Sequence, residues 1–349
     1  MIPLLLALVS PVAPVSLEDP RWKVEAKESR IERYQGRDAL FVRLGVAWLE
    51  GVSFQDGTVE FDVAMPPEAG FHGLAFRAQD SENYEHIYLR PHLSDKPDAT
   101  QYQPVFNGVA GWQIYSDPRY AQPATIPADR WVHVKAAFRG KRLELSVDGH
   151  LLIFPDLVRP LAAGKIGLMT SASLARFANV IVRPNAFESE GGEGAKAPET
   201  LPGIVEHWRV SSPFPEAARE WPSLKWDSID ATVRGIANLA TARNRDGTNN
   251  TVFAAVTLRA QKAGPVRVRF GFSDRVVVYL NGQPLYRGND KFQTRDYRFL
   301  GTVGLFDELV LPLNRGDSKL WFAVSEDFGG WAVTMQIVDP GSVTVVAAE

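Results

Sequence analysis

The chain contains no cysteine among its 349 residues. This absence excludes disulfides, thiolate metal sites, cysteine nucleophiles and the lipid attachment of bacterial lipoproteins. We therefore expect packing, rather than covalent cross-links, to stabilise the fold.

An excess of positive charge is also missing. The 38 Lys and Arg residues are opposed by 41 Asp and Glu residues, which leaves a formal net charge of −3. Proteins that hold a nucleic-acid backbone carry a basic surface, and this composition predicts none. Nucleic acid is not an expected partner.

The common catalytic and metal-binding motifs are absent. The sequence has no Gly-x-Ser-x-Gly, no His-Glu-x-x-His and no glycine run that could cradle a phosphate, and its six histidines are scattered. We expect no cofactor. A structural calcium ion could be held by Asp side chains and backbone carbonyls, although no EF-type spacing identifies one.

Long apolar runs are absent as well. Residues 1–9 are apolar but too few to span a bilayer, and small residues follow them. Because no Lys or Arg precedes this run, it is either a poor secretory signal or a buried terminal strand. We predict a signal segment over residues 1–18, a secreted or periplasmic location and no membrane span.

What the sequence does contain is a two-residue hydrophobic period. Residues 57–63 and 142–147 alternate apolar with polar side chains, as half-buried antiparallel strands do. Asp148-Gly149 follows the second of these and is typical of a tight hairpin turn.

The second half of the chain repeats this pattern. Residues 265–272 and 276–280 read as strands, and Asn281-Gly282 follows as another hairpin turn. Helical periodicity is nearly absent, with short helices conceivable only at residues 215–219 and 229–240.

A segment rich in Gly, Pro and Glu divides the chain at residues 185–203, because such a composition buries little apolar surface. We therefore predict an all-β fold of two β-sandwich (jelly-roll) domains, at residues 19–184 and 204–349, joined by this linker.

Four motifs in the first half occur in a characteristic order: residues 131–135 (WVHVK), 145–149 (LSVDG), 164–168 (GKIGL) and 177–182 (FANVIV). This series resembles the concanavalin A-like lectin/glucanase superfamily, especially its laminin-G-like and 3-keto-disaccharide-hydrolase-like branches. The resemblance implies a jelly roll whose concave sheet holds a carbohydrate. It does not distinguish lectins from hydrolases, lyases or interaction modules.

The second half resembles a galactose-binding-like jelly roll over about residues 204–340. The resemblance rests on residues 268–282, 309–311 and 320–324, with the hairpin at 279–282 as its most specific part. It implies that any ligand is bound by loops at one end.

Residue parity indicates which side chains of the first sandwich could meet a ligand. If Ile87 and Leu89 face the core, then the even-numbered side chains from Tyr84 to Arg90 face outward. Aromatic rings can stack on pyranoses, and Arg or His can donate to hydroxyls or a carboxylate. The predicted ligand-binding residues are Arg77, His86, Tyr88, Arg90, Tyr102, Asn107 and Trp112. The alternative is a solvated sheet face without a ligand, with Trp112 in the core.

Evidence for catalysis is weak. The Glu-x-Asp-x-x-Glu motif of the retaining glucanases is absent, although Glu60 and Asp62 alternate on one strand. Parity places Glu85 on the core side, where we expect it to pair with Arg43 or Lys135. Catalytic residues are therefore unknown, with Glu85 and His86 as weak candidates for a proton carrier.

In the second half, the candidate ligand-binding residues on the loops are Asp274, Asp290 and the segment 326–331 (EDFGGW), in which an aromatic beside two acids and two glycines could stack a sugar; Trp331 could equally pack the core. We expect an exported, two-module protein that binds an oligo- or polysaccharide on the first sandwich. The alternatives are a glycoside hydrolase or polysaccharide lyase at the same face, and a protein-interaction or surface scaffold.

Overall fold

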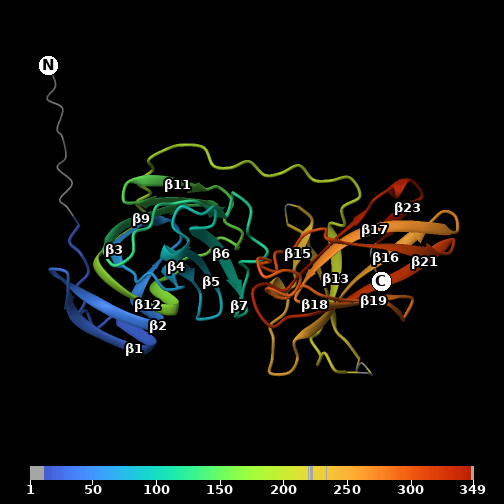
Figure 1. The fold of residues 1–349 in the computed structure, drawn as a ribbon, viewed down its shortest axis with the longest axis horizontal. Helices are drawn as coiled ribbons and strands as arrows, with labels where there is room; N and C mark the ends of the chain where they lie inside the picture. The colour runs from blue at the N-terminus through green and yellow to red at the C-terminus, as the bar shows by residue number, and fades with distance from the viewer. Residues whose placement is uncertain (1–11, 219, 221–222, 233, 347–349) are drawn as a thin grey trace, which may run out of the picture. The chain divides into compact units, whose positions relative to one another are not determined.

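The computed structural model describes residues 12–218, 220, 223–232 and 234–346. Regular structure in these residues is almost entirely β-strand, with only three short 3-10 helices, so the predicted all-β fold is confirmed (Figure 1). Of the two ranges in which short helices were conceivable, residues 215–218 form a turn, and residue 219 lies outside the described part. Residues 229–240 are mostly strand, at 226–230 and 236–238, and only their end joins the short 3-10 helix Leu239–Thr241. Of the predicted signal segment, residues 1–11 also lie outside it.

The structure divides into two compact units. The first comprises residues 1–79, 85–101 and 121–195, and the second comprises residues 80–84, 102–120 and 196–349. The sequence-based boundaries at 184 and 204 stay a prediction, as does the galactose-binding-like character of the second half.

The first unit is built on long antiparallel strands. Its sheet runs in the order β11-β10-β9-β3-β12-β4-β5, and β2 pairs with both β1 and β12. The elements are β1 (Trp22–Tyr34), β2 (Arg37–Phe54), β3 (Gly57–Ala64), β4 (Phe71–Ala78), β5 (Tyr84–Leu89), η1 (Pro91–Leu93), β8 (Ala121–Gln122), β9 (Trp131–Arg139), β10 (Arg142–Val147), β11 (His150–Phe154) and β12 (Gly164–Pro184). Strand β6 (Thr100–Phe106) begins in this unit and pairs there with β8.

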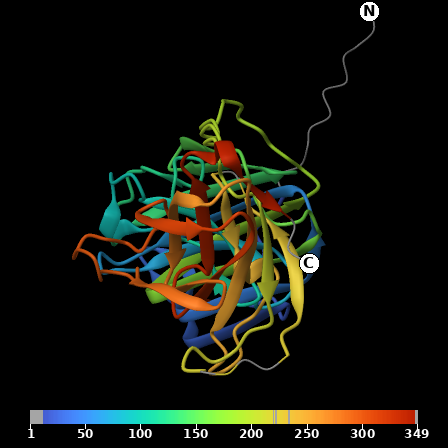
Figure 2. The same cartoon turned by 90° about the vertical axis from the view of Figure 1, so that its right-hand side faces the viewer.

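The second unit is a sandwich of two sheets. One runs β14-β13-β16-β21-β18-β19, with β23 also on β16, and the other runs β15-β22-β17-β20; Figure 2 shows its strands in yellow to red. The elements are β7 (Val109–Ala110), β13 (His207–Ser211), β14 (Trp226–Asp230), β15 (Ile236–Asn238), η2 (Leu239–Thr241), β16 (Thr251–Ala260), β17 (Gly264–Ser273), β18 (Arg275–Leu280), β19 (Gln283–Asn289), β20 (Asp307–Leu313), β21 (Gly316–Ser325), β22 (Ala332–Ile337), η3 (Pro340–Ser342) and β23 (Val343–Val346).

Both predicted hairpin turns are confirmed. Asp148 and Gly149 have φ angles of 47° and 82°, and Asn281 and Gly282 have 51° and 82°. Positive φ at both central residues matches the right-handed twist of the flanking strands. These turns join β10 to β11 and β18 to β19.

The core of the second unit lies between its sheets and includes Trp208, Phe270, Phe322 and Trp331. Trp331 is fully buried, and its indole N–H donates to the carbonyl of Val324 at 2.9 Å. The structure thus places Trp331 in the core, not on a ligand-binding loop, because its ring fills space between the two sheets.

A bulge in β4 changes which side of the sheet its residues face. Two residues of β4, Phe76 and Arg77, oppose the single Ile166 of β12, and Arg77 has a φ of 48°. The extra residue turns the Arg77 side chain toward the core, where its guanidinium carbon lies 5.3 Å from the centre of the Phe138 ring.

This bulge supplies the partner of Glu85. The fully buried Glu85 carboxylate lies 3.4 Å from Arg77 Nη1, and the same guanidinium donates to the carbonyls of Gln55 at 2.6 Å and Gly140 at 2.7 Å. The predicted partners are wrong, because Arg43 pairs with Glu28 and Lys135 pairs with Glu188 and Glu190.

The substitution Glu85→Ala should destabilise the fold strongly, because it removes the fully buried carboxylate partner of the buried Arg77 and leaves only the part-exposed Asp56, at 3.3 Å, to pair with it. We expect the free energy of unfolding to fall by about 3 kcal/mol, measured by urea denaturation of the full chain. The matched control is Glu82→Ala, at an exposed position a few residues earlier. Equal effects of the two substitutions would contradict a structural role for Glu85.

Candidate functional site

The ligand-binding face predicted on the first unit is buried. Arg77 is 2% exposed, His86 3%, Tyr88 2% and Arg90 5%. The prediction that these side chains face outward into solvent is therefore wrong. Whether they bind a ligand, and whether Glu85 or His86 carries a proton, stay predictions.

Internal hydrogen bonds explain why polar side chains can be buried on β5 and its neighbours. Tyr88 Oη donates to Gln101 Oε1 at 2.7 Å, and Arg90 Nη2 donates to the same oxygen at 2.6 Å. Arg90 also lies 3.3 Å from the Asp98 carboxylate. Burial lowers the pKa of His86 to about 3 and raises that of Tyr88 to about 12, so both are neutral at physiological pH. Their alternation with Ile87 and Leu89 reflects a polar interior.

Glu60 and Asp62 are likewise not a solvated pair. Asp62 is buried and pairs with Arg37 and His133, and Glu60 pairs with Arg183. Both carboxylates of β3 therefore have ion partners, which lie on β2, β9 and β12.

Two further predicted residues belong to the second unit and have structural contacts. Tyr102 is fully buried, with its ring centre 6.0 Å from that of Tyr120. Asn107 occupies a turn with a φ of 50°, and its amide donates to the carbonyl of Ala240 at 2.9 Å. Sequence reasoning placed both on the rim of the first sandwich.

The structure does bring Trp112, Asp274 and Asp290 together at the loops of the second unit. The backbone N–H groups of Asp327 and Phe328 donate to the Asp274 carboxylate at 2.7 and 2.9 Å. The backbone N–H of Asp290 donates to the carbonyl of Asp274 at 2.7 Å. The loops that carry Asp274, Asp290 and Phe328 are far apart in the sequence and are therefore joined by these hydrogen bonds.

Gln113 attaches the segment that carries Trp112 to these loops. Its side-chain oxygen accepts from Ser273 Oγ at 2.9 Å, and its side-chain nitrogen donates to the carbonyl of Leu300 at 2.9 Å. Its backbone N–H donates to the carbonyl of Gly329 at 3.0 Å. Gly301 and Gly329 have positive φ, and a Cβ at either position would collide with the Gln113 side chain.

Three aromatic rings lie against one another on these loops. The centre of the Trp112 ring is 6.3 Å from that of Phe292 and 5.9 Å from that of Phe328. Phe292 is 43% exposed and Phe328 61% exposed, whereas Trp112 is half-buried. We call these three residues, with Lys291 and Asp327 beside them, the loop-end surface.

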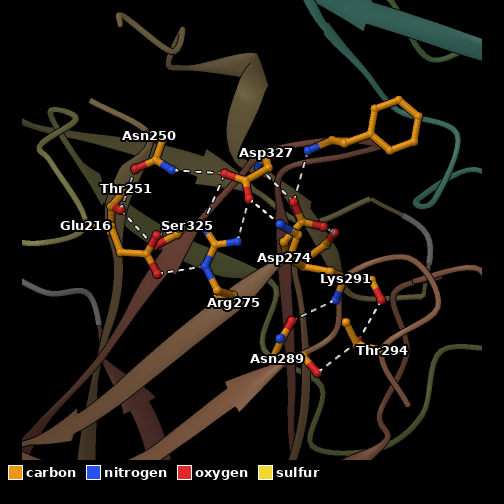
Figure 3. Close-up of polar contacts among 12 residues, drawn as sticks. Glu216, Asn250, Thr251, Asp274, Arg275, Asn289, Lys291, Thr294, Ser325 and Asp327 are labelled. Carbon is orange, nitrogen blue, oxygen red and sulfur yellow. Dashed lines mark hydrogen bonds and ion pairs between the residues drawn. The ribbon is translucent and has the colours of Figure 1, made fainter. Parts of the chain in front are cut away.

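A network of ion pairs holds the polar part of the loop-end surface (Figure 3). Asp327 accepts from Arg275 and from Lys291 Nζ, each at 2.6 Å, and Arg275 also binds Glu216 at 2.6 Å. The hydrogen bond from Arg275 is the main reason that the pKa of Asp327 lies well below its usual range. Two cations face two anions, so the network is close to neutral.

Behind the network lie three buried carboxyl groups: Asp274, Asp290 and Glu326, each 1% exposed. Burial, aided by the neighbouring Asp274 carboxylate, raises the pKa of Glu326 to about 8, and burial raises that of Asp290 to about 6 against the opposing charge of Arg295. Burial also raises the pKa of Asp274, against hydrogen bonds that lower it. These acids support the surface from within and are not exposed to a ligand.

Sequence reasoning missed Phe292 and gave Gln113 no role of its own. Phe328 lies in the segment 326–331, which the sequence marks as a candidate because an aromatic residue stands beside two acids and two glycines; Phe292 and Gln113 carry no such local signal. Within the described ranges, no group of three or more His, Asp or Glu side chains could hold a metal ion. None of the helices in the described part of the chain has the length and apolar character needed to cross a bilayer.

Stability of the protein should fall as the pH rises from about 5 to 8. The Glu326 pKa is raised from 4.5 to about 8 in the folded chain, so the folded state keeps a proton that the unfolded chain releases across this window. We expect Glu326→Gln to flatten this dependence and to increase stability at pH 8 by on the order of 3 kcal/mol, measured by urea denaturation at several pH values. The control Glu206→Gln, at an exposed glutamate, should keep the wild-type slope.

No protein-family model matches the chain, and no curated protein matches it. Among solved structures, it is similar in part to the carbohydrate-binding module CBM66 of Bacillus subtilis, with 19% identity, a TM-score of 0.36 and coverage of 47% of this chain and 95% of that chain. It is also similar to a Bacillus licheniformis β-glucanase, with 12% identity, a TM-score of 0.37 and coverage of 50% and 97%. Chicken galectin 2 matches with 11% identity, a TM-score of 0.31 and coverage of 40% and 99%. No family assignment follows from these likenesses.

Proposed function

We propose that this protein binds a neutral carbohydrate at the loop-end surface of its second unit. The observation that carries the proposal is the contact of Phe328 and Phe292, both substantially exposed, with Trp112 beside a fixed ion pair. Exposed aromatic rings of this size are costly in water unless a ligand covers them.

The chemistry of the loop-end surface suits a sugar. The apolar face of a pyranose can stack on an aromatic ring, while its hydroxyl groups need directed donors and acceptors nearby. Lys291 Nζ and the Asp327 carboxylate supply one of each and remain 39% and 38% exposed. Because these charges neutralise each other, they favour uncharged hydroxyls over an ionised ligand.

Preorganisation supports the proposal. The Gln113 amide donates to the carbonyl of Leu300, the Asp274 carboxylate accepts from the backbone N–H of Phe328, and Arg275 holds Asp327 by two hydrogen bonds. A ligand would then pay little for ordering these loops, which leaves more of the contact energy for affinity. In this proposal Asp274 and Asp290 position the site and do not touch the sugar.

The sequence alone placed the glycan on the first sandwich instead. We place it on the loop-end surface because Arg77, His86, Tyr88 and Arg90 are almost completely covered. Export of the protein stays part of the proposal, since extracellular carbohydrate is the substrate class that such a surface would meet.

Phe328→Ala should weaken binding of a neutral polysaccharide about tenfold, because loss of one stacking ring removes roughly 1.4 kcal/mol. Affinity gel electrophoresis against barley β-glucan, xylan, galactan and galactomannan would identify a bound polymer and measure the loss. Phe306→Ala is the matched control, since Phe306 is 53% exposed in the same unit but lies outside the ring cluster.

Failure of all four polymers to retard the native chain would overturn the proposal, as would equal affinities of the two variants. The same incubations should release no reducing ends. Product release from the native chain would favour the hydrolase alternative over binding alone.

A further inference from the structure

A groove of about 670 Å³ lies on the outer face of the sheet of the second unit that contains β13, β16 and β21. Cross-strand register places its side chains on one face, because Ala255 is opposite Arg209 on one side and Trp321 on the other. The next residue of β16, Val256, is buried in the core between the two sheets. The groove is therefore a surface feature of the sheet, built on regular strands.

Two tryptophans line this groove. The ring centres of Trp226 and Trp321 are 5.4 Å apart, and both side chains are half-buried. The fully buried Phe253 supports them, with its ring centre 5.1 Å from that of Trp321 and 6.5 Å from that of Trp226. The apolar face of a pyranose ring matches the accessible part of such a supported indole pair.

A second hollow of about 440 Å³ adjoins the groove. It is lined by residues of β13, β16 and β23 and shares Arg209, Ala255 and Val346 with the groove. Ligand sites in proteins commonly measure roughly 300–1,000 Å³. Each hollow alone has this size, so the two together favour an extended ligand with several similar units.

Positive and negative charges balance along the two hollows. Their lining residues include three cations and three acids: Arg209, Arg259, Lys319, Glu206, Asp230 and Asp317. Asp317 pairs with Arg259 at 2.6 Å, Asp230 contacts His207 at 2.7 Å, and Arg209 also interacts within the structure. Such a lining offers an ionised ligand no net attraction and leaves a neutral ligand as the better match.

We propose that this groove binds an internal stretch of a neutral polysaccharide chain. Trp226 and Trp321 stack a pyranose ring, and the hydroxyl of Thr257, which also lines the groove, bonds to the sugar hydroxyls. Asn281 is held at the groove because its side-chain oxygen accepts from the backbone N–H of Lys319 at 2.8 Å, and its amide N–H groups are donors for the sugar.

The groove shares no residue with the loop-end surface, so neither site depends on the other for binding. On a long polymer the two sites act together, so loss of either one weakens retention. Short oligosaccharides are therefore the probes that test the groove by itself.

Isothermal titration calorimetry of the full chain with cellohexaose, xylohexaose and mannohexaose tests the proposal in the Phe328→Ala variant, whose loop-end surface is impaired. We expect at least one of these hexasaccharides to bind. Its affinity should change less than about twofold between about 50 and 500 mM NaCl, because salt screens charges and the ligand carries none. Adding Thr257→Trp, which fills the groove with an indole, should weaken this binding about tenfold, and adding Trp321→Ala should do the same.

Matched variants keep the result interpretable. Val310→Trp is the control for Thr257→Trp, because it adds the same indole at a 60% exposed strand position on the other sheet. Thr257→Trp changes a half-buried side chain and removes no aromatic ring, so it tests the groove even if Trp321→Ala fails to fold. Hexagalacturonate, an acidic hexasaccharide, should bind more weakly than the neutral sugar.

The proposal is overturned if none of the three neutral hexasaccharides binds Phe328→Ala, if Thr257→Trp and Val310→Trp leave equal affinities, or if hexagalacturonate binds more tightly. Self-association through this face, seen as a dimer that Thr257→Trp converts to a monomer, would also overturn it. Binding that is present in the native chain and lost in Phe328→Ala would leave the loop-end proposal standing without the groove. Binding that Phe328→Ala leaves unchanged and Thr257→Trp abolishes would support the groove without the loop-end surface.

Discussion

The buried side chain of Gln113 is the constraint on which the candidate site depends. Its amide and backbone meet four partners, at Ser273, Leu300, Val303 and Gly329, and it is completely buried. An unpaired amide in such a position would cost free energy, so all four partners must be present together. This requirement fixes the neighbouring Trp112 against Phe292 and Phe328, and it explains why Gly301 and Gly329 leave room for the amide.

Around this constraint, the second unit carries features that stability alone would not favour. Three carboxyl groups with raised pKa values lie within it, and aromatic rings are exposed at its loops. Such costs are tolerated where a site must be held in one geometry, and shifted pKa values often mark these places.

The first unit shows how a polar interior can imitate a binding face. Along β5, polar and apolar side chains alternate as they would on a half-exposed strand. Yet Gln101, Asp98 and the bulge at Arg77 provide internal partners for its polar residues. Alternation reports two chemically different sides of a strand; it does not report which side meets water.

The sequence by itself determined the all-β class, the strands at residues 57–63, 142–147, 265–272 and 276–280, and the turns at Asp148-Gly149 and Asn281-Gly282, because two-residue periodicity and positive φ are local properties. It also identified Asp274, Asp290 and Trp112 as candidate ligand-binding residues. Only the tertiary structure decided that Arg77 and His86 are covered and that Trp112 meets Phe328. It alone placed Trp226 beside Trp321. Exposure and such contacts depend on segments that are distant along the chain, and no local pattern encodes what packs over a strand.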